Sequence, residues 1–331
     1  MSENKKRVYI YPMVSAVDLE VKHPYIFNLS NALKDKFTIC NYGRKTKAGI
    51  FDMYRYLGKT DIVYLNWIED IGRGKLSYIQ LFFFIVFIFM AKISGIKIIW
   101  THHNVKSHYE SSWMNVFLTK FLIKNVDKIV IHTKQSKKYI SEQYWGKMIY
   151  FFHPITDLSK EIKKNKEVKY DILIWGGIRR SKGIEVFLKH LYTNPNYRNI
   201  KVKIVGKINE DKLKKEIKSF LTPNILLEDR FVEDDELQLL HSEAKFVLFP
   251  YTGESVLNSG VVVKSLPLKT RIIGPDKGAF KDLADLGLID VYKEFSDILT
   301  ILQKNVKKKN VDDFCNHFTW NNFGLFLKEQ I

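Results

Sequence analysis

Two cations stand in a glycine-rich segment in the second half of the chain. The segment Trp175–Ile184 lies between a short apolar stretch and a helical pattern, and it contains Gly177, Arg179 and Lys182. Glycine permits the tight turn that joins a strand to a helix. Because Arg179 and Lys182 are three residues apart, we expect them to share one face of the opening helical turn. Cations are unfavourable at a helix N-terminus unless an anion binds there, so the pair predicts an anion site; two solvated surface cations are the alternative.

A second junction of similar character follows the most apolar stretch of this half. It contains Tyr251 and Glu254 and ends on Asn258, Ser259 and Gly260. We expect the backbone at Gly260 to approach a phosphate, with Asn258 and Ser259 adding hydrogen bonds. Glu254 is suited to accept from sugar or ribose hydroxyls, and Ser259 is equally suited to cap a following helix. Two anion-ready junctions indicate a diphosphate ligand such as a nucleotide-sugar.

A histidine-rich segment in the first half follows the apolar stretch that ends at Trp100. It contains His103, His108 and Glu110, each of which could act as a general base or bind a substrate hydroxyl. A metal site is not predicted, because His102 and His103 are adjacent and point apart in an extended chain, and no H-E-x-x-H pattern occurs. The alternative is that these polar groups only satisfy the backbone of a loop.

Two further loops give weaker signals. Trp67 and Glu69 follow another expected strand end, and an aromatic face beside a carboxylate commonly holds a sugar ring, although it is also common in plain packing. In the second half, the backbone at Phe231 and Val232 could bind a nucleobase. The acidic residues that follow Val232 need no functional explanation, because they suit the first turn of a helix.

The elements that must position these residues are strands alternating with helical patterns. This alternation predicts parallel sheets covered on both faces, and twelve strands predict two doubly wound α/β domains of Rossmann-like type. Ligands of such sheets bind at the carboxyl ends of the strands. The expected strands are Val8–Tyr11, Phe37–Cys40, Ile62–Leu65, Ile96–Trp100, Lys128–Ile131, Met148–Phe152, Ile172–Trp175, Val202–Val205, Ile225–Leu227, Phe246–Phe249, Arg271–Ile273 and Ile289–Tyr292.

Composition narrows the class of protein. The 331 residues are 46% hydrophobic, which is enough for two packed cores. Two cysteines far apart in the sequence argue against a disulfide framework and fit a reducing cytosol. The first strand is expected almost at the N-terminus, so we expect no signal peptide. The net charge is +17, of which residues 1–153 carry +12, and such a basic half attracts nucleic acid or an anionic membrane surface.

The membrane interpretation has a second support in Leu81–Ala91, eleven apolar residues without a polar break. In a helix they span about half of a bilayer core, so a transmembrane helix is not predicted. A buried core helix is one alternative. The other is a helix that is partly buried and partly inserted into lipid, which the phenylalanines on every side of it favour.

Taken in order, these motifs resemble those of a known family. They are Asn66-Trp-x-Glu69, Trp100-Thr-x-His-Asn104, Gly177-x-Arg-x-x-Lys-Gly183, Phe231-Val232 and Pro250-Tyr251 with Asn258-Ser-Gly260. The chain resembles GT-B glycosyltransferases of bacterial exopolysaccharide and capsule assembly, of the family 4 type. The similarity covers nearly the whole chain, from His23-Pro-Tyr25 to Phe318-Thr-Trp320.

The resemblance implies a domain plan of two Rossmann-like domains facing a central cleft. Residues 1–155 would bind the acceptor, residues 156–313 would bind a nucleotide-sugar, and a C-terminal helix in 314–331 would pack back on the first domain. It implies acceptor contacts at Tyr25, Trp67 and Glu69, and His103 near the donor sugar. It also implies that no metal or other cofactor is needed, because cations such as Arg179 and Lys182 stabilise the leaving diphosphate.

One feature of the family is missing. Many retaining members carry two glutamates eight residues apart, but here Val262 follows Glu254 at that spacing, and Lys264 stands near the expected second glutamate. The choice between inversion and retention therefore stays open.

The sequence thus predicts a hexosyltransferase for cell-surface polysaccharide, on the cytoplasmic face of the membrane. The donor would be a nucleoside diphosphate sugar and the acceptor a lipid-linked saccharide. A sugar-nucleotide epimerase of the same fold is the alternative enzyme. A basic nucleic-acid-binding protein is the non-enzyme alternative, although no recognised nucleic-acid-binding module is present and no nucleic-acid partner is predicted.

Overall fold

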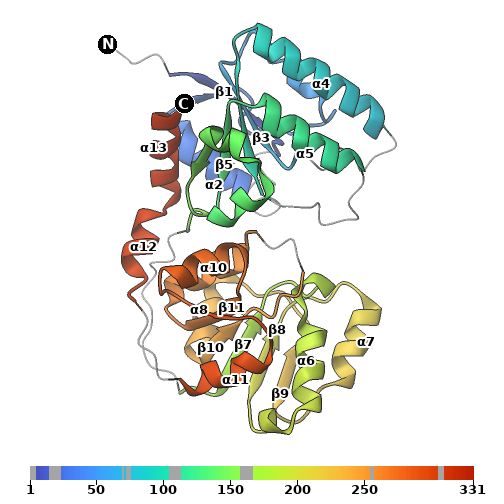
Figure 1. The fold of residues 1–331 in the computed structure, drawn as a ribbon, viewed down its shortest axis with the longest axis vertical. Coiled ribbons are helices and arrows are strands. Elements are labelled where there is room, and N and C mark those ends of the chain that lie inside the picture. The colour runs from blue at the N-terminus through green and yellow to red at the C-terminus, as the bar shows by residue number, and fades with distance from the viewer. Residues whose placement is uncertain are drawn as a thin grey trace. The chain divides into compact units, whose positions relative to one another are not determined.

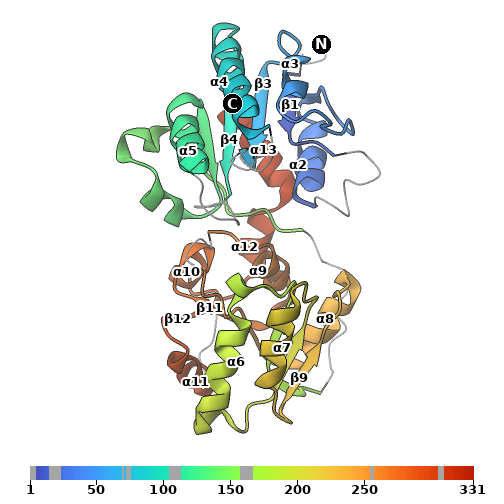
Figure 2. The same ribbon diagram turned by 90° about the vertical axis from the view of Figure 1, so that its right-hand side faces the viewer.

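The computed structural model describes residues 5–14, 24–68, 71, 76–103, 113–156, 167–253, 257–304 and 309–331. The chain divides into two compact units, each with its own sheet and core (Figures 1 and 2). Unit 1 comprises Met1–Pro154 together with Phe318–Ile331, and unit 2 comprises Ile155–His317. The chain therefore returns to unit 1 at Phe318, four residues after the start of the C-terminal helix proposed from sequence.

Unit 1 is built on a parallel six-stranded sheet in the order β2-β1-β3-β4-β5-β6. All six strands predicted for this half are present, and no strand end is shifted by more than two residues. The strands are β1 (Arg7–Tyr11), β2 (Thr38–Ile39), β3 (Ile62–Asn66), β4 (Lys97–His102), β5 (Lys128–Ile131) and β6 (Met148–Tyr150). The helices that belong to it are α2 (Pro24–Lys34), α3 (Phe51–Tyr54), α4 (Ser77–Ile93), α5 (Trp113–Asn125) and α13 (Trp320–Gln330), with 3-10 turns η2 (Lys134–Tyr139) and η3 (Glu142–Lys147).

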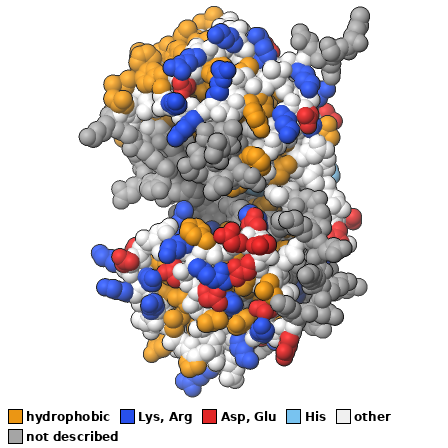
Figure 3. All heavy atoms as spheres, turned by 180° about the vertical axis from the view of Figure 1, so that it is seen from behind, with side chains coloured by type: hydrophobic (Ala, Val, Ile, Leu, Met, Phe, Trp, Pro, Cys, Tyr) orange, Lys and Arg blue, Asp and Glu red, His pale blue; other side chains and the backbone are white. Residues whose placement is uncertain are grey.

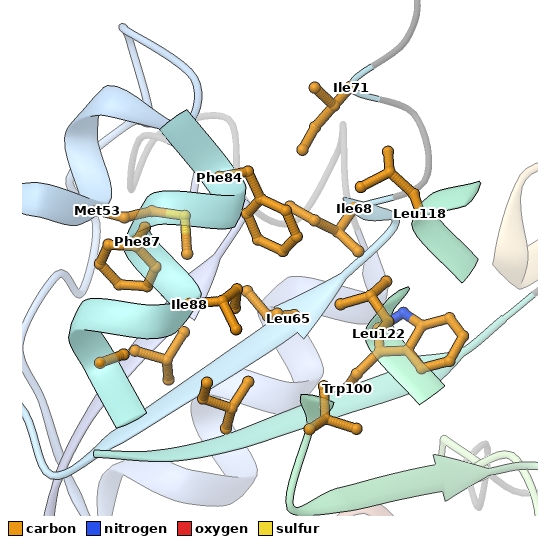
Figure 4. Close-up of a cluster of buried hydrophobic side chains, with 14 of the residues drawn as sticks. Met53, Leu65, Ile68, Ile71, Phe84, Phe87, Ile88, Trp100, Leu118 and Leu122 are labelled. Carbon is orange, nitrogen blue, oxygen red and sulfur yellow. The ribbon is translucent and has the colours of Figure 1, made fainter. Parts of the chain in front are cut away.

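Each face of this sheet has its own hydrophobic core, because neighbouring strand residues point to opposite faces. Side chains of α4 and α5 pack on one face, in a core that includes Phe84 and Phe87 of α4, Leu122 of α5 and Trp100 of β4 (Figure 4). The opposite face carries the α2 and α13 side chains. Helix α13 approaches α2 so closely that a side chain at Gly324 would overlap the carbonyl oxygen of Ala32. The C-terminal helix is thus part of unit 1.

Helix α4 is buried along one side and exposed along the other. Leu81, Phe84, Phe87, Ile88 and Ala91 are buried in the core. Other apolar side chains of the same helix are exposed and are taken up below. Among the described residues, no helix combines the length and the apolar character needed to cross a bilayer.

Unit 2 repeats the architecture with a parallel six-stranded sheet in the order β12-β11-β10-β7-β8-β9. Its strands, also all predicted, are β7 (Tyr170–Trp175), β8 (Val202–Val205), β9 (Ile225–Glu228), β10 (Ala244–Leu248), β11 (Arg271–Pro275) and β12 (Asp290–Tyr292). Its helices are α6 (Ile184–Thr193), α7 (Asp211–Ser219), α8 (Asp234–Ser242), α9 (Gly260–Ser265), α10 (Gly278–Asp285), α11 (Ser296–Gln303) and α12 (Asp312–His317), with 3-10 turns η4 (Arg180–Lys182), η5 (Pro195–Tyr197) and η6 (Leu266–Leu268).

The strand orders determine where ligands can bind. In unit 2 the chain order reverses beside β7, which pairs with β10 on one side and β8 on the other. In unit 1 it reverses at β1, between β2 and β3. Crevices outside such reversal points are the general ligand sites of open α/β sheets. The segments singled out from sequence follow β7 and β10 in unit 2 and β3 and β4 in unit 1.

Candidate functional site

The glycine-rich junction of unit 2 is built differently from the sequence prediction. Arg179 is extended, and Lys182 ends the short turn η4. Gly183 then adopts the left-handed conformation, with φ of 64°, before α6 begins. The two cations therefore do not share a face of the first turn of α6, because a left-handed residue separates them from that helix. The prediction of a common helical face was wrong.

The two junctions of unit 2 touch each other. A side chain at Gly183 would overlap the carbonyl oxygen of Pro250, and the backbone N–H of Gly253 donates to the Ser181 carbonyl at 3.4 Å. Gly176, at φ of 101°, lies against Val261 of α9. Only glycine fits such backbone contacts. The adjacency of β7 and β10 thus joins two segments more than 60 residues apart into one site.

Lys182 is the chemical centre of this contact. Its ammonium donates to the Tyr251 hydroxyl at 2.5 Å, and that hydroxyl shares a 3.0 Å hydrogen bond with Ser259. Among the described residues no carboxylate pairs with Lys182. Burial, and secondarily the charge of Arg179, lower the pKa of Lys182 to about 7. A half-buried cation without a counter-ion is costly by itself and favours an anionic ligand.

The remaining donor candidates neighbour Lys182 or Ser259 in the sequence. Arg179 and Gly177 are exposed next to Lys182, and Asn258 and Gly260 flank Ser259. Ser259 occupies the N-cap position of α9, but its side chain forms no cap hydrogen bond there and bonds to Tyr251 instead.

The structure gives less support to the predicted nucleobase loop and does not describe the predicted glutamate of the donor loop. Phe231 and Val232 follow β9, which β8 separates from β7, and Phe231 is 73% exposed. Glu254 lies outside the described residues. Lys264, at the place of the second glutamate of the resemblance, pairs with Asp234 at 2.6 Å.

Unit 1 gathers an aromatic and histidine cluster beyond the ends of its strands. The ring of Trp67 stacks on His103 with centroids 4.3 Å apart, and Tyr25 meets His103 edge-on at 4.7 Å. Trp67 has a φ of 46°, in the left-handed region that a bulky residue rarely occupies. Such local strain of about 1–3 kcal/mol persists where the surroundings hold a side chain in place, often at a functional site.

The hydrogen bonds assign the histidine tautomers. The Asn66 amide nitrogen donates to the Tyr11 carbonyl at 3.3 Å, so its oxygen accepts from Nε2–H of His103 at 3.1 Å. The ring lone pair of His103 is therefore on Nδ1. Burial, reinforced by the neighbouring histidines, holds the pKa of His103 well below its usual range. A buried, neutral histidine next to a sugar-sized aromatic surface can accept a proton from a substrate hydroxyl.

Sequence reasoning missed three members of this cluster, His132, His153 and Trp320. His132 accepts from the Tyr25 hydroxyl at 2.8 Å, because its Nδ1 donates to the Phe151 carbonyl at 2.7 Å. The rings of His153 and Trp320 both pack edge-on against Tyr25. The two histidines follow expected strand ends, so the rule used for His103 could have found them. Trp320 could not be found in this way, because it comes from the far end of the chain.

Three site residues predicted in the first half of the chain, Glu69, His108 and Glu110, lie outside the described residues, as Glu254 does. In the part of the chain that the structure describes, no group of three or more His, Cys, Asp or Glu side chains is placed to hold a metal ion.

The buried histidines predict a loss of stability in acid. Burial lowers the pKa of His132 to about 3 and that of His153 to about 4, against about 6.5 in an unfolded chain. Between those values the unfolded chain binds more protons than the folded one, so the free energy of unfolding falls as the pH falls from about 6.5 to 4. The urea concentration at the midpoint of unfolding should therefore fall as the pH is lowered through this range. It should fall less steeply in His153→Asn than in the parent. An equal slope in both proteins would contradict this assignment.

Comparisons with known proteins agree with this architecture. HepE of Anabaena, solved in complex with UDP and glucose, aligns with a TM-score of 0.61 at 11% identity over 98% of this chain and 95% of that one. A glycosyltransferase from Rickettsia africae aligns with a TM-score of 0.58 at 14% identity, over 99% of this chain and 97% of that one. The UDP-GlcNAc 2-epimerase of Neisseria meningitidis, bound to UDP-GlcNAc, aligns at 0.52 and 12% over 98% of each chain. The sequence matches no protein-family model and no curated protein.

These likenesses define the class of the protein by its fold. The chain is a two-domain α/β protein with the GT-B fold, as predicted from its sequence. The solved proteins with this fold include several glycosyltransferases and a sugar-nucleotide epimerase.

Proposed function

We propose that this protein is a glycosyltransferase that moves a hexose from a nucleoside diphosphate sugar to a saccharide acceptor. The observation that carries the proposal is the contact between the two βα junctions of unit 2, where Tyr251 holds Lys182 and no described carboxylate pairs with it. Likeness to HepE, which was solved with UDP and glucose, supports the same class of donor.

In the proposed reaction, unit 2 binds the donor. Lys182 and Arg179 neutralise the diphosphate as the glycosidic bond breaks, a role that fixed cations fill without a metal ion. The turn at Asn258, Ser259 and Gly260 supplies further hydrogen bonds to the phosphates. Phe231 and Val232 are the candidates for nucleobase contacts.

Unit 1 binds the acceptor in this proposal. Tyr25 and Trp67 offer aromatic surfaces to a sugar ring. His103 is the candidate general base through Nδ1, and His108 and Glu110 remain candidates for the same role. The acceptor we propose is a lipid-linked saccharide of cell-surface polysaccharide assembly.

An epimerase acting on a nucleotide-sugar is the second candidate, and the likeness to the Neisseria epimerase favours it. The two reactions differ in what becomes of the donor. A transferase releases the nucleoside diphosphate only when an acceptor is present, or slowly to water, whereas an epimerase converts one nucleotide-sugar into another.

The test is a panel of nucleoside diphosphate hexoses. We expect at least one member to raise the unfolding temperature, and to release its nucleoside diphosphate when a lipid-linked saccharide is added, with a chelator present throughout. Conversion of the donor to an epimer without release would establish the alternative. Failure of every member to bind would overturn both.

A membrane location is proposed for the same enzyme. The outer sides of α4 and α5 carry exposed apolar side chains, and Figure 3 shows hydrophobic side chains gathered at one corner of the molecule, with Lys and Arg beside them. Rings of the two helices meet at Tyr78 and Trp113. The α4–α5 apolar face consists of Leu76, Tyr78, Ile79, Phe82, Phe83, Phe89, Met90, Ile93, Trp113, Val116 and Phe117.

We propose that this face docks on the anionic inner surface of the cell membrane. Lys92, Lys120 and Lys124 on the same helices are exposed, and the first half of the chain carries most of the net positive charge. Apolar side chains surrounded by lysines suit a bilayer of anionic lipids better than a neutral protein surface.

The docking proposal predicts loss of vesicle binding when the face is made polar. Phe82→Glu should lower retention on anionic vesicles about tenfold or more, because burying a phenylalanine is worth about 1.5–3 kcal/mol. Tyr192→Glu, at an exposed aromatic residue of unit 2, is the matched control and should bind like the parent. Equal retention of both variants would contradict the proposal.

A further inference from the structure

A basic pocket of about 610 Å³ lies in unit 1 beside β1. Tyr9, on its wall, belongs to the core on the α4 side of the sheet, whereas Tyr25 of the aromatic and histidine cluster belongs to the opposite core. The pocket is therefore distinct from the candidate acceptor site. Neither the proposed donor residues nor the proposed acceptor residues line it.

Four cations line this pocket against one carboxylate. Arg44 and Lys45 follow β2, and Arg55 and Lys59 follow α3. Arg44, Lys45 and Lys59 form no ion pair with any described residue. Four exposed cations around one pocket repel one another, so an anion in the pocket would relieve an unfavourable charge density.

The carboxylate of Asp52 contacts the groups that form the wall of the pocket. Asp52 accepts from the backbone N–H groups of Lys47 and Ala48 at 2.6 and 3.0 Å, and its other oxygen lies 3.5 Å from the Arg55 guanidinium. These contacts fix the loop after β2 and orient Arg55. With Asp52 engaged in this way, the lining keeps a net positive charge.

A buried hydroxyl completes the lining. Tyr9 is 1% exposed, and its ring lies 4.6 Å from that of Tyr56. Its hydroxyl lies near the Thr46 side chain, which also lines the pocket, but forms no hydrogen bond of ordinary geometry with the described residues. A buried hydroxyl without a partner is costly, and a ligand oxygen would satisfy it. Arginine and lysine around a hydroxyl donor form the usual environment of a phosphate group.

The pocket adjoins the α4–α5 apolar face through α3. The Tyr54 hydroxyl donates to the Phe83 carbonyl at 2.6 Å, and the Phe51 ring packs edge-on against Phe83. The next residues after Phe51 and Tyr54 are Asp52 and Arg55, which line the pocket. A phosphate held here would thus lie beside side chains suited to lipid.

We propose that this pocket binds the phosphate monoester or diphosphate headgroup of an anionic membrane lipid. The phosphate site stands on the pocket alone, while the lipid source rests on the membrane docking proposed above. Such a site would anchor unit 1 at the bilayer by a specific headgroup in addition to the apolar face.

The first arm of the test measures phosphate binding to the full chain. Inorganic pyrophosphate is titrated calorimetrically into the parent, Arg44→Gln, Lys59→Gln and Tyr9→Phe. Lys138→Gln is the matched control, because Lys138 follows β5, which β3 and β4 separate from β1 in the sheet. Each pocket variant should lose about tenfold in affinity, as expected for a hydrogen bond to a charged group, and the control should match the parent. Pyrophosphate can also occupy the donor site, so the titration is repeated with saturating donor. Equal affinity of pocket and control variants would overturn the site.

The second arm separates the two sources of phosphate. Vesicles that contain phosphatidic acid, which exposes a phosphate monoester, are compared with vesicles of equal charge that contain phosphatidylserine. The parent and Lys138→Gln should prefer phosphatidic acid, and Arg44→Gln should lose the preference while still binding both through the apolar face. Pyrophosphate binding without a lipid preference would overturn the lipid source and identify a soluble phosphate as the ligand. Neither result depends on glycosyl transfer.

Discussion

Lys182→Met should lower turnover with a nucleoside diphosphate hexose about 10²–10³-fold, the usual loss when one preorganised group that stabilises a leaving charge is removed. The reason is the position of the ammonium, held by Tyr251 where the two junctions of unit 2 meet. Methionine keeps an unbranched stem but removes the ammonium, with its charge and its hydrogen bond to Tyr251. The measurement is nucleoside diphosphate release at saturating acceptor, together with the thermal shift caused by the donor.

Arg180→Met is the matched control in the same loop. The Arg180 guanidinium pairs with Glu210 and Glu216, so it is already neutralised within unit 2. Its loss should change turnover by no more than about threefold, because exposed pairs contribute little. If the donor raises the unfolding temperature of Lys182→Met and Arg179→Ala as much as that of the parent, the assignment of the donor site is wrong.

The same lysine gives donor binding a characteristic pH dependence. With a pKa near 7 in the folded chain, Lys182 is largely neutral above that pH, and binding a diphosphate must then return a proton to it. Affinity for the hexose donor, whose diphosphate does not titrate in this range, should fall between about pH 7 and 9, but not in Lys182→Met. In the absence of donor, Lys182 also affects stability. Between about pH 7 and 10.5 this lysine binds a proton more fully in the unfolded chain than in the folded one. Its contribution to the free energy of unfolding therefore increases as the pH rises through that range.

His103→Gln should lower turnover about 10²–10⁴-fold while leaving the thermal shift by the donor unchanged. Glutamine can still donate to the Asn66 oxygen, so the hydrogen bond that orients His103 is retained and only the titratable ring is lost. The donor shift should persist because the proposed donor residues all belong to unit 2. The pH profile of turnover should lose its acid limb in this variant.

His317→Gln, at an exposed histidine of α12, controls for histidine loss as such and should act like the parent. If His103→Gln also keeps turnover within about threefold of the parent, His103 is not the base. The role then passes to His108 or Glu110, or to a front-face mechanism that needs no protein base. Variants at those two positions decide among these outcomes.

Much of the fold could be predicted because its signals are local. Apolar runs such as Ile172–Trp175 and Val202–Val205 are long enough to be strands, and the helical patterns between them require parallel pairing. The rule that ligands bind beyond strand ends then selected Trp67, His103 and Lys182 from sequence alone. The same rule, applied more evenly, would have included His132 and His153.

The conformation of the donor junction could not be predicted in the same way. Glycines 176 and 183 indicated a tight turn but not its direction. At Gly183 the nearby Pro250 carbonyl leaves no room for a side chain. That neighbour exists only because β10 pairs with β7, two strands that are distant in sequence. Helix periodicity, a local property, placed Arg179 and Lys182 on a common face that this pairing does not allow.

The sequence by itself determined the two α/β units, their strands and the polar residues that follow them, because hydrophobic period and strand length are properties of short segments. Only the tertiary structure decided what surrounds those residues. The order of strands brings Tyr251 to Lys182 and removes water from the ammonium, and the return of α13 brings Trp320 to Tyr25. Burial and hydrogen-bond partners change the pKa of a side chain. Both depend on contacts between segments that are distant in sequence, and a local sequence pattern does not contain that information.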